Sequence, residues 1–173
     1  HEPQRVFTCS WSDFFHPAAD DWRADAWAII RETPHLTYQI LTKRPERIAA
    51  HLPADWGEGW PNVWLGVSVE NQRWTTRMIE LAKVPARLRF VSAEPLLGWL
   101  DVGDALVPMG FQWVIAGGES GPDARGCEPA WLHSLEAQCR RVGVAFYLKQ
   151  LGGHPHARAH EKAVHDGVSF TEF

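Results

Sequence analysis

The sequence has few cysteines, no long apolar run and no excess of positive charge. Cys9, Cys127 and Cys139 form no CxxC or CxxxCxxC pattern, so free thiols in a reducing compartment are favoured over a disulfide framework. No stretch of about 18 apolar residues is available to span a membrane, and no segment resembles a signal peptide. We therefore expect a cytoplasmic protein with no membrane partner.

The charge balance excludes one further class of protein. The formal net charge of −4 gives no general positive field of the kind that draws proteins onto nucleic acid, although it leaves a local basic groove open. With 45% hydrophobic and 22% charged residues, the chain has enough apolar material for one buried core and is not expected to be disordered. The ten tryptophans are spread along the chain, so we interpret most of them as packing residues.

Short runs of apolar, β-branched and aromatic residues alternate with longer segments of helical periodicity, which is typical of β/α units. The predicted strands are Arg5 to Cys9, Leu36 to Leu41, Val63 to Val69, Leu88 to Ser92, Gln112 to Ala116 and Val144 to Leu148. The predicted helices are Asp20 or Asp21 to Glu32, Pro45 to His51 or Leu52, Asn71 to Lys83 and Pro129 to Val142, with one turn between Pro95 and Gly110. This order predicts an α/β fold, a TIM-like partial parallel β/α barrel of about six strands over residues 1–153, followed by a C-terminal tail over residues 154–173.

Helical spacing also predicts which side chains face the core. In the first helix these are Trp22, Ala26, Trp27, Ile29 and Ile30. In the helix from Asn71 they are Trp74, Met78, Ile79 and either Leu81 or Ala82. Cys139 lies in the middle of the last helix, which indicates a buried structural thiol.

Polar residues follow every predicted strand. Because ligands bind outside the carboxyl ends of parallel strands, these residues are expected to converge. The predicted catalytic residues are Lys43, Glu70, Glu94, Glu119 and Lys149. The predicted cofactor contacts are Arg44, Ser68, Ser92, Gly117, Gly118, Ser120 and Gln150. Such a mixed-charge cluster can hold a zwitterion, a phosphate or an amino-acid moiety, but the same charges could simply solvate the barrel mouth or pair with one another.

Three other features have less specific interpretations. The glycines of residues 117–121 permit a backbone nest for an anion, or a tight turn with no ligand, and their spacing matches neither a phosphate loop nor a dinucleotide fold. Asp13 and His16 lie in a loop without a nucleophile motif, which favours capping or hydrogen bonding. The tail histidines His154, His156, His160 and His165 lack a recognisable ligand spacing, so we assign no metal ligands and expect a solvated tail.

Several segments together resemble a known family: LTKRPERI, PNVWLGVSVEN, RFVSAEPLLG, VIAGGESGPDAR, WLHSLEAQCRRVGVAFYLKQLGG and DGVSFTEF. They are similar to the three-Cys-motif proteins, an uncharacterised family associated with phages and prophages, whose barrel is related to radical S-adenosylmethionine enzymes. The resemblance runs from about Arg5 to the end of the chain. It implies a partial barrel, a [4Fe-4S] cluster and S-adenosylmethionine, with the strand-end segments as recurrent motifs.

The chain departs from this family in its cysteines. Members carry three cysteines in an N-terminal segment, and three thiolates are needed to leave one iron of the cluster open. This chain has no such segment, so we do not expect it to assemble the cluster alone. Two explanations stay open: the sequence begins downstream of the cysteine segment, as its first residue His1 suggests, or this member has lost radical chemistry.

Three functional hypotheses follow. The first is an enzyme, or the C-terminal part of one, that uses S-adenosylmethionine on an unidentified substrate, with nucleic acid or a nucleotide as the expected class. The second is a non-catalytic binding module that acts with a partner protein through the tryptophans of residues 56–64. The third is a cofactor-free hydrolase or lyase that uses Glu70, Glu94 or Glu119 as acid or base.

Overall fold

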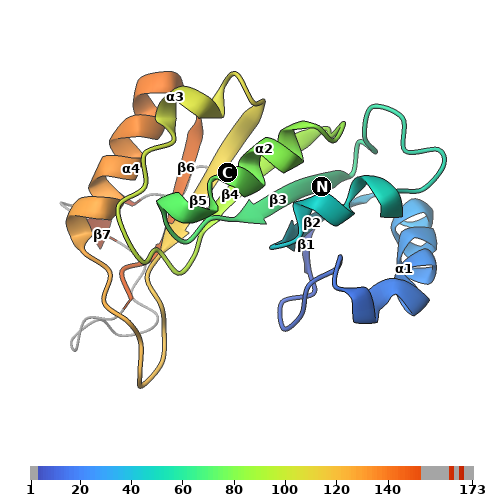
Figure 1. Ribbon diagram of the computed structural model, residues 1–173, viewed down its shortest axis with the longest axis horizontal. Coiled ribbons are helices and arrows are strands. Elements are labelled where there is room, and N and C mark those ends of the chain that lie inside the picture. Colours follow the sequence, from blue (N-terminus) through green and yellow to red (C-terminus); the bar gives the residue numbers. More distant parts are fainter. Residues whose placement is uncertain (1–3, 153–163, 166–167, 170–173) are drawn as a thin grey trace.

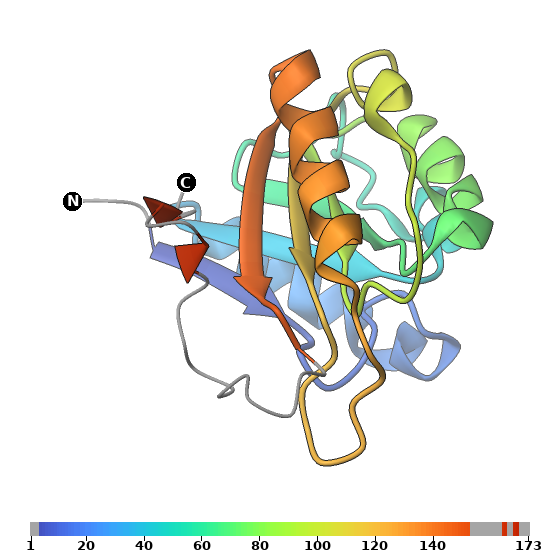
Figure 2. The ribbon, with the colours of Figure 1, turned by 90° about the vertical axis from the view of Figure 1, so that its left-hand side faces the viewer.

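A single curled sheet of parallel strands forms a half-barrel (Figures 1 and 2). The computed structural model describes residues 4–152, 164–165 and 168–169. The strands lie side by side in chain order, and each pairs in parallel with the next. They are β1 (Gln4–Thr8), β2 (Leu36–Thr42), β3 (Val63–Ser68), β4 (Leu88–Ala93), β5 (Phe111–Gly117) and β6 (Ala145–Gln150). The predicted six-stranded partial barrel is confirmed.

The connections between strands contain the helices, as the alternating sequence pattern predicts. They are α1 (Asp20–Glu32), α2 (Thr76–Ala82), α3 (Gly103–Leu106) and α4 (Pro129–Val142). Helix α4 has the expected ends: Pro129 stands in its first turn, and Gly143 closes it with φ +71° while its amide donates to the carbonyl of Arg140. Figure 2 shows α2, α3 and α4 on one side of the sheet.

Two predicted helices are wrong in detail. The segment from Pro45 forms two 3-10 helices, Pro45–Arg47 and Ala49–His51. The helix predicted from Asn71 begins as the 3-10 helix Gln72–Trp74, because the Asn71 side chain accepts from the amide of Arg73, and becomes α-helical only at Thr76. The remaining 3-10 helix, Pro17–Ala19, precedes α1 and is capped by the ring of His16.

The two faces of the sheet are packed differently. The main core lies between the helices and the convex face, and it contains Trp27, Ile30, Met78, Leu81 and Cys139. A second, smaller cluster consists of strand residues alone and covers the concave face: Leu41, Trp64, Leu88, Phe90, Trp113, Ile115, Ala145 and Tyr147. The helix faces were partly mispredicted. Trp22, Ile29 and Ile79 are exposed, because α1 and α2 each contact the sheet along a narrower stripe than their apolar residues cover.

The concave face determines which strand-end residues can meet. Side chains alternate between the two faces of a strand. The concave face contains positions 64 and 66 of β3, 88 and 90 of β4, and 145 and 147 of β6, and the next position on the same face of each strand is 68, 92 and 149, respectively. The ladder between β5 and β6 is irregular at its end. Ala116 pairs with Leu148 but Gly117 pairs with Gln150, so Lys149 is an extra residue in β6.

The predicted tail lies mostly outside the described residues. Within it the structure describes β7 (Val164–His165) and β8 (Val168–Ser169), which pair antiparallel, and only the backbone of His165. His154, His156 and His160 lie outside the described part, so the solvated tail and the boundary at residue 153 stay predictions. None of the helices in the described part of the chain has the length and apolar composition needed to cross a bilayer.

Candidate functional site at the carboxyl ends of the strands

Two ion pairs join four of the five predicted catalytic residues at the carboxyl ends of the strands. Lys43, just after β2, contacts Glu70, just after β3, with 2.6 Å between Nζ and Oε1. Lys149 of β6 contacts Glu94, just after β4, with 3.1 Å between Nζ and Oε1. Because the first pair links neighbouring strands and the second reaches across β5, one polar edge extends from β2 to β6. We call this edge the rim.

Glu70 is the most tightly held carboxylate of the rim. Its second oxygen accepts from Arg77 Nη1 at 2.8 Å, and the same guanidinium nitrogen donates to the carbonyl of Ser68 at 2.7 Å. Burial acts to raise the pKa of Glu70, but hydrogen bonding to Lys43 and the charges of Lys43 and Arg77 outweigh it and lower the pKa. Arg77 in turn stacks on Trp74, with 4.1 Å between its guanidinium carbon Cζ and the centroid of the ring. Arg77 was not predicted as a site residue, because its position inside a helix gives no strand-end signal.

Lys149 reaches Glu94 over a strand that ends in glycine. Gly117 ends β5, which lies between β4 and β6. The hydroxyl of Ser92 donates to the other oxygen of Glu94 at 3.2 Å. The extra residue in β6 thus contributes the only ammonium group of that strand.

Within the described residues, Glu119 forms no ion pair with the other predicted catalytic residues and pairs instead with Arg125 in the β5–α4 loop. The Arg125 side chain donates to both Glu119 oxygens at 2.7 and 3.0 Å, and the Arg125 backbone amide donates at 2.9 Å. These bonds lower the pKa of Glu119 to about 2. This loop follows β5, so the pair lies at the same carboxyl edge of the sheet as the rim.

Asp13, for which hydrogen bonding was predicted, is a central acceptor of the rim. One oxygen accepts from the amide of Phe15 at 2.9 Å and the hydroxyl of Thr42 at 2.7 Å. The other accepts from the amide of Lys43 at 3.0 Å and from Arg44 Nη1 at 2.9 Å. Burial acts to raise the pKa of Asp13, but these four donors together lower it. Arg44 therefore binds Asp13 and ties β2 to the loop after β1.

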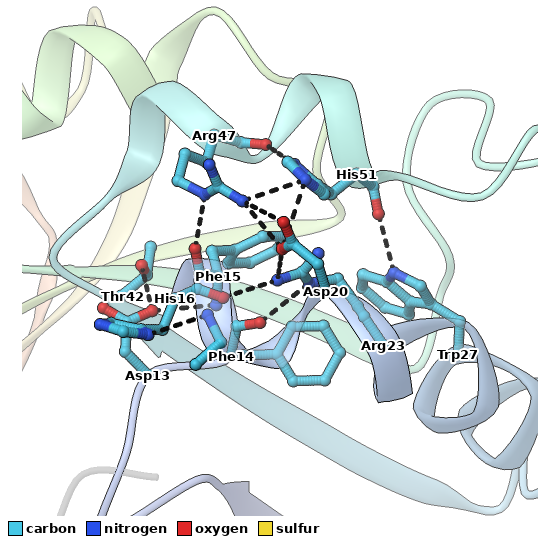
Figure 3. Close-up of polar contacts among 11 residues, drawn as sticks. Asp13, Phe14, Phe15, His16, Asp20, Arg23, Trp27, Thr42, Arg47 and His51 are labelled. Carbon is cyan, nitrogen blue, oxygen red and sulfur yellow. Dashed lines mark hydrogen bonds and ion pairs between the residues drawn. The ribbon is translucent and has the colours of Figure 1, made fainter.

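Two arginines hold the loop after β1 from opposite sides (Figure 3). Arg23, 3% exposed, donates to the carbonyls of Phe14 at 2.9 Å and His16 at 3.0 Å. Arg47 donates to the carbonyl of Phe15 at 2.8 Å, and both arginines bind Asp20. The rings of Phe14 and Phe15 are buried. The loop is therefore fixed by its own backbone as well as by its side chains.

The glycine-rich segment is shaped by backbone packing. A Cβ on Gly118 would lie 2.4 Å from the carbonyl oxygen of Leu151 and 2.8 Å from Cα of Gly152. The amide of Gly118 donates to the carbonyl of Gln150, and the Gln150 side chain donates to the carbonyl of Gly118 at 2.8 Å. Gly118 and Gln150 are thus hydrogen-bonded to each other. The tight-turn interpretation of the glycine-rich segment explains both hydrogen bonds without a ligand. Ser68 is buried at the end of β3, and Ser120 is exposed in the loop.

The tryptophan surface proposed for a partner protein is not formed. Trp56 is 5% exposed, and its Nε1 donates to the carbonyl of Pro85 at 2.8 Å. Trp60 packs against Trp27 and Trp56, with ring centroids 5.6 and 5.7 Å away. Trp64 lies on the concave face. Trp56 and Trp60 therefore pack together with Trp27 of α1, whereas Trp64 packs on the opposite face of the sheet.

The cysteines do not form a site for a cluster or a metal ion. Cys139 is buried in α4, where burial raises the pKa of its thiol to about 12, and burial raises that of Cys127 to about 11. Cys9 follows β1, with φ +56°. Within the described residues no three His, Cys, Asp or Glu side chains gather closely enough to hold a metal. A [4Fe-4S] cluster therefore does not fit the described residues.

These features define a parallel α/β half-barrel protein with a charged rim at the carboxyl ends of its strands. The chain belongs to the family described as "Protein of unknown function (DUF5131)", whose model matches residues 1–172. No curated protein and no solved structure matches the chain. The phage association and the relation to radical S-adenosylmethionine enzymes stay predictions.

Proposed function

We propose that this chain carries the ligand-binding half of an S-adenosylmethionine-dependent enzyme, with the rim as the site that binds the amino-acid part of that molecule. The observation that carries the proposal is the pair of lysine–glutamate contacts, Lys43 with Glu70 and Lys149 with Glu94. In parallel β/α folds this edge of the sheet is where ligands bind.

The donor set of the rim suits a zwitterion. A carboxylate such as Glu94 can accept from the ligand's ammonium group, and an ammonium such as Lys149 can donate to its carboxylate, so the ligand exchanges one internal ion pair for two charge-assisted contacts. Lys149 has a half-exposed side chain, while that of Glu94 is 19% exposed, so the ammonium can move while the carboxylate keeps its place. When bound, S-adenosylmethionine would supply an activated sulfonium centre.

The alternative of a cofactor-free acid/base enzyme has less support. An efficient general base or acid has a pKa near the working pH. The surrounding cations lower the pKa of Glu70, and Arg125 lowers that of Glu119 to about 2, so both carboxylates are ionised and weakly basic at neutral pH. Their suggested role is to hold positive charge. No step through an iron–sulfur cluster is proposed, because the described residues do not fit one.

Isothermal titration calorimetry with S-adenosylmethionine tests the proposal. We expect binding by the intact chain, at least tenfold weaker binding by Glu94→Gln, and unchanged binding by Glu80→Gln, which removes an exposed carboxylate paired with Lys83 on α2. Adenosine, which lacks the zwitterion, should bind at least tenfold more weakly than S-adenosylmethionine. Absence of heat with millimolar ligand, or equal binding of adenosine, would refute the proposal.

A further inference from the structure

Four ion pairs at the rim share one orientation: the cation faces solvent and the carboxylate is the more buried partner. The exposed fractions of cation and anion are 51% and 9% for Lys43 with Glu70, and 35% and 14% for Arg44 with Asp13. They are 60% and 31% for Arg125 with Glu119, and 55% and 19% for Lys149 with Glu94.

This orientation is not general on the surface of the protein. Arg140 with Glu136 and Lys83 with Glu80 follow it, but Arg141 with Asp104 reverses it, at 56% and 85%. Arg31 with Asp55 exposes both partners about equally, at 54% and 58%. Because Coulomb energy falls with distance, an approaching ligand meets the outer layer of charge first. The rim therefore presents positive charge although the chain has a formal net charge of −4.

An exposed aromatic side chain stands two residues before Asp13, the partner of Arg44 in this layer. Trp11, in the loop that follows β1, has an exposed fraction of 101%. The loop around it is fixed: the amide of Ser12 donates to the carbonyl of Cys9, Asp13 accepts four hydrogen bonds, and Arg23 holds the carbonyls of Phe14 and His16. An indole held in solvent on a fixed loop is a surface on which an unpaired base can stack.

We propose that the rim and Trp11 together bind a single-stranded nucleic acid, with the cations contacting successive phosphates and Trp11 stacking on a base. This inference rests on the proposed function, since it names the substrate class of the same site. Neighbouring strands are about 4.8 Å apart, so the cations from β2 to β6 span on the order of 19 Å, more than one mononucleotide can contact. A duplex keeps its bases paired and would gain nothing from Trp11.

Fluorescence anisotropy with a labelled 12-nucleotide single strand of mixed sequence, as DNA and as RNA, tests the proposal. We expect binding at 50 mM salt that weakens with added salt, and at least fivefold weaker binding of a duplex of the same length. Trp11→Ala should weaken binding of the single strand about tenfold, whereas Trp11→Phe, which keeps a stacking ring, should recover most of it. Circular dichroism checks that both variants fold.

Charge variants separate the charge at the rim from the net charge of the chain. Lys149→Gln should weaken binding and lower the salt slope by about 0.7, the value for one lost contact with a single strand. Lys83→Gln, which removes an equally exposed lysine on the outer surface, should leave both unchanged. Glu94→Gln, which frees Lys149, should strengthen oligonucleotide binding although it weakens binding of S-adenosylmethionine.

The results decide between the two proposals. No binding of the single strand, equal binding of the duplex, or equal effects of Lys149→Gln and Lys83→Gln would overturn the nucleic-acid inference. If S-adenosylmethionine still binds in that case, the proposed function stands without it. If the single strand binds and S-adenosylmethionine does not, the rim is a nucleic-acid site and the proposed function fails.

Discussion

The loops that follow β1 and β5 both leave the sheet at its carboxyl end, but they are held in different ways. In the first, the buried side chain of Arg23 and the partly exposed side chain of Arg47 bind backbone carbonyls, and Asp13 accepts four hydrogen bonds. In the second, Gly118 is bonded to Gln150, and the part of the loop beyond it is held by the exposed Glu119–Arg125 pair and a backbone hydrogen bond from the amide of Ala124 to the carbonyl of Gly121 at 3.3 Å. Figures 1 and 2 show this second loop extending beyond the strand ends.

The difference indicates how one rim can combine a fixed part with an adaptable part. A loop whose backbone is bonded to buried groups costs more to displace than one held by exposed charges, because displacement would leave polar groups unpaired inside the protein. We therefore expect ligand binding to change the β5–α4 loop more than the β1–α1 loop. The predictions below test this difference, beginning with the largest expected effect.

Removing Arg23 should have the largest effect on stability. Arg23→Met leaves the carbonyls of Phe14 and His16 without their donor in a buried place, so we expect the free energy of unfolding to fall by about 3 kcal/mol. Urea denaturation followed by circular dichroism measures it. Arg31→Met, which removes an exposed arginine from the same helix, should cost less than about 1 kcal/mol. Equal costs for the two variants would show that the first loop is not held by Arg23.

Gly118 is the point at which the second loop joins its scaffold. Gly118→Ala should lower the free energy of unfolding by about 2 kcal/mol, because the new Cβ would overlap the backbone of residues 151–152. Gly126→Ala, at a position with no neighbouring atom within 4 Å, should change stability by less than about 1 kcal/mol. The same urea titration compares them. A neutral Gly118→Ala would mean that the end of β6 moves aside easily.

Asp13→Asn should have an intermediate effect that depends on pH. We expect a loss of about 1.5 kcal/mol at pH 7, because the amide cannot accept from all four donors. The pKa of Asp13 is lower in the folded protein than in the unfolded chain, so its contribution is present above the unfolded pKa and is lost as pH falls through the folded pKa. The difference between the two proteins should therefore shrink below about pH 4. A difference that stays constant from pH 7 to pH 3 contradicts this assignment.

Glu119→Gln should have the smallest effect on global stability. The side chain belongs to an exposed pair, so the urea midpoint should not change measurably. The loop itself should open more often, and limited proteolysis should cut residues 120–128 several times faster than in the unaltered protein. Glu80→Gln serves as the control and should leave the cleavage rate unchanged. Unchanged cleavage in Glu119→Gln would show that Arg125 does not hold the loop.

Much of the fold could be predicted from the sequence because the strands are rich in apolar, β-branched and aromatic residues and the helices have clear ends. The six strands, the extent of α1 and α4 and the buried thiol of Cys139 follow from local patterns. The convergence of Lys43 with Glu70 and of Lys149 with Glu94 followed from the rule for parallel strands. These predictions needed only properties of neighbouring residues and one rule of topology.

The rest depends on contacts between distant residues. Arg77 joins the rim from the face of α2, and Arg23 supports it from α1, yet each has the spacing of an ordinary surface arginine. The exposure of Ile29 and Ile79 could not be predicted from helical period, since it depends on how wide a stripe the curled sheet covers. The partner residue of Glu119 lies six positions away in a loop, where no periodic pattern applies.

The extra residue in β6 makes the rim sensitive to chain length. Lys149 has no partner across the β5–β6 ladder, so a chain one residue shorter at this point could keep every hydrogen-bonded rung and still lose the ammonium opposite Glu94. Among chains of this fold, a single insertion or deletion in the last strand would then separate members that have this charge from members that lack it.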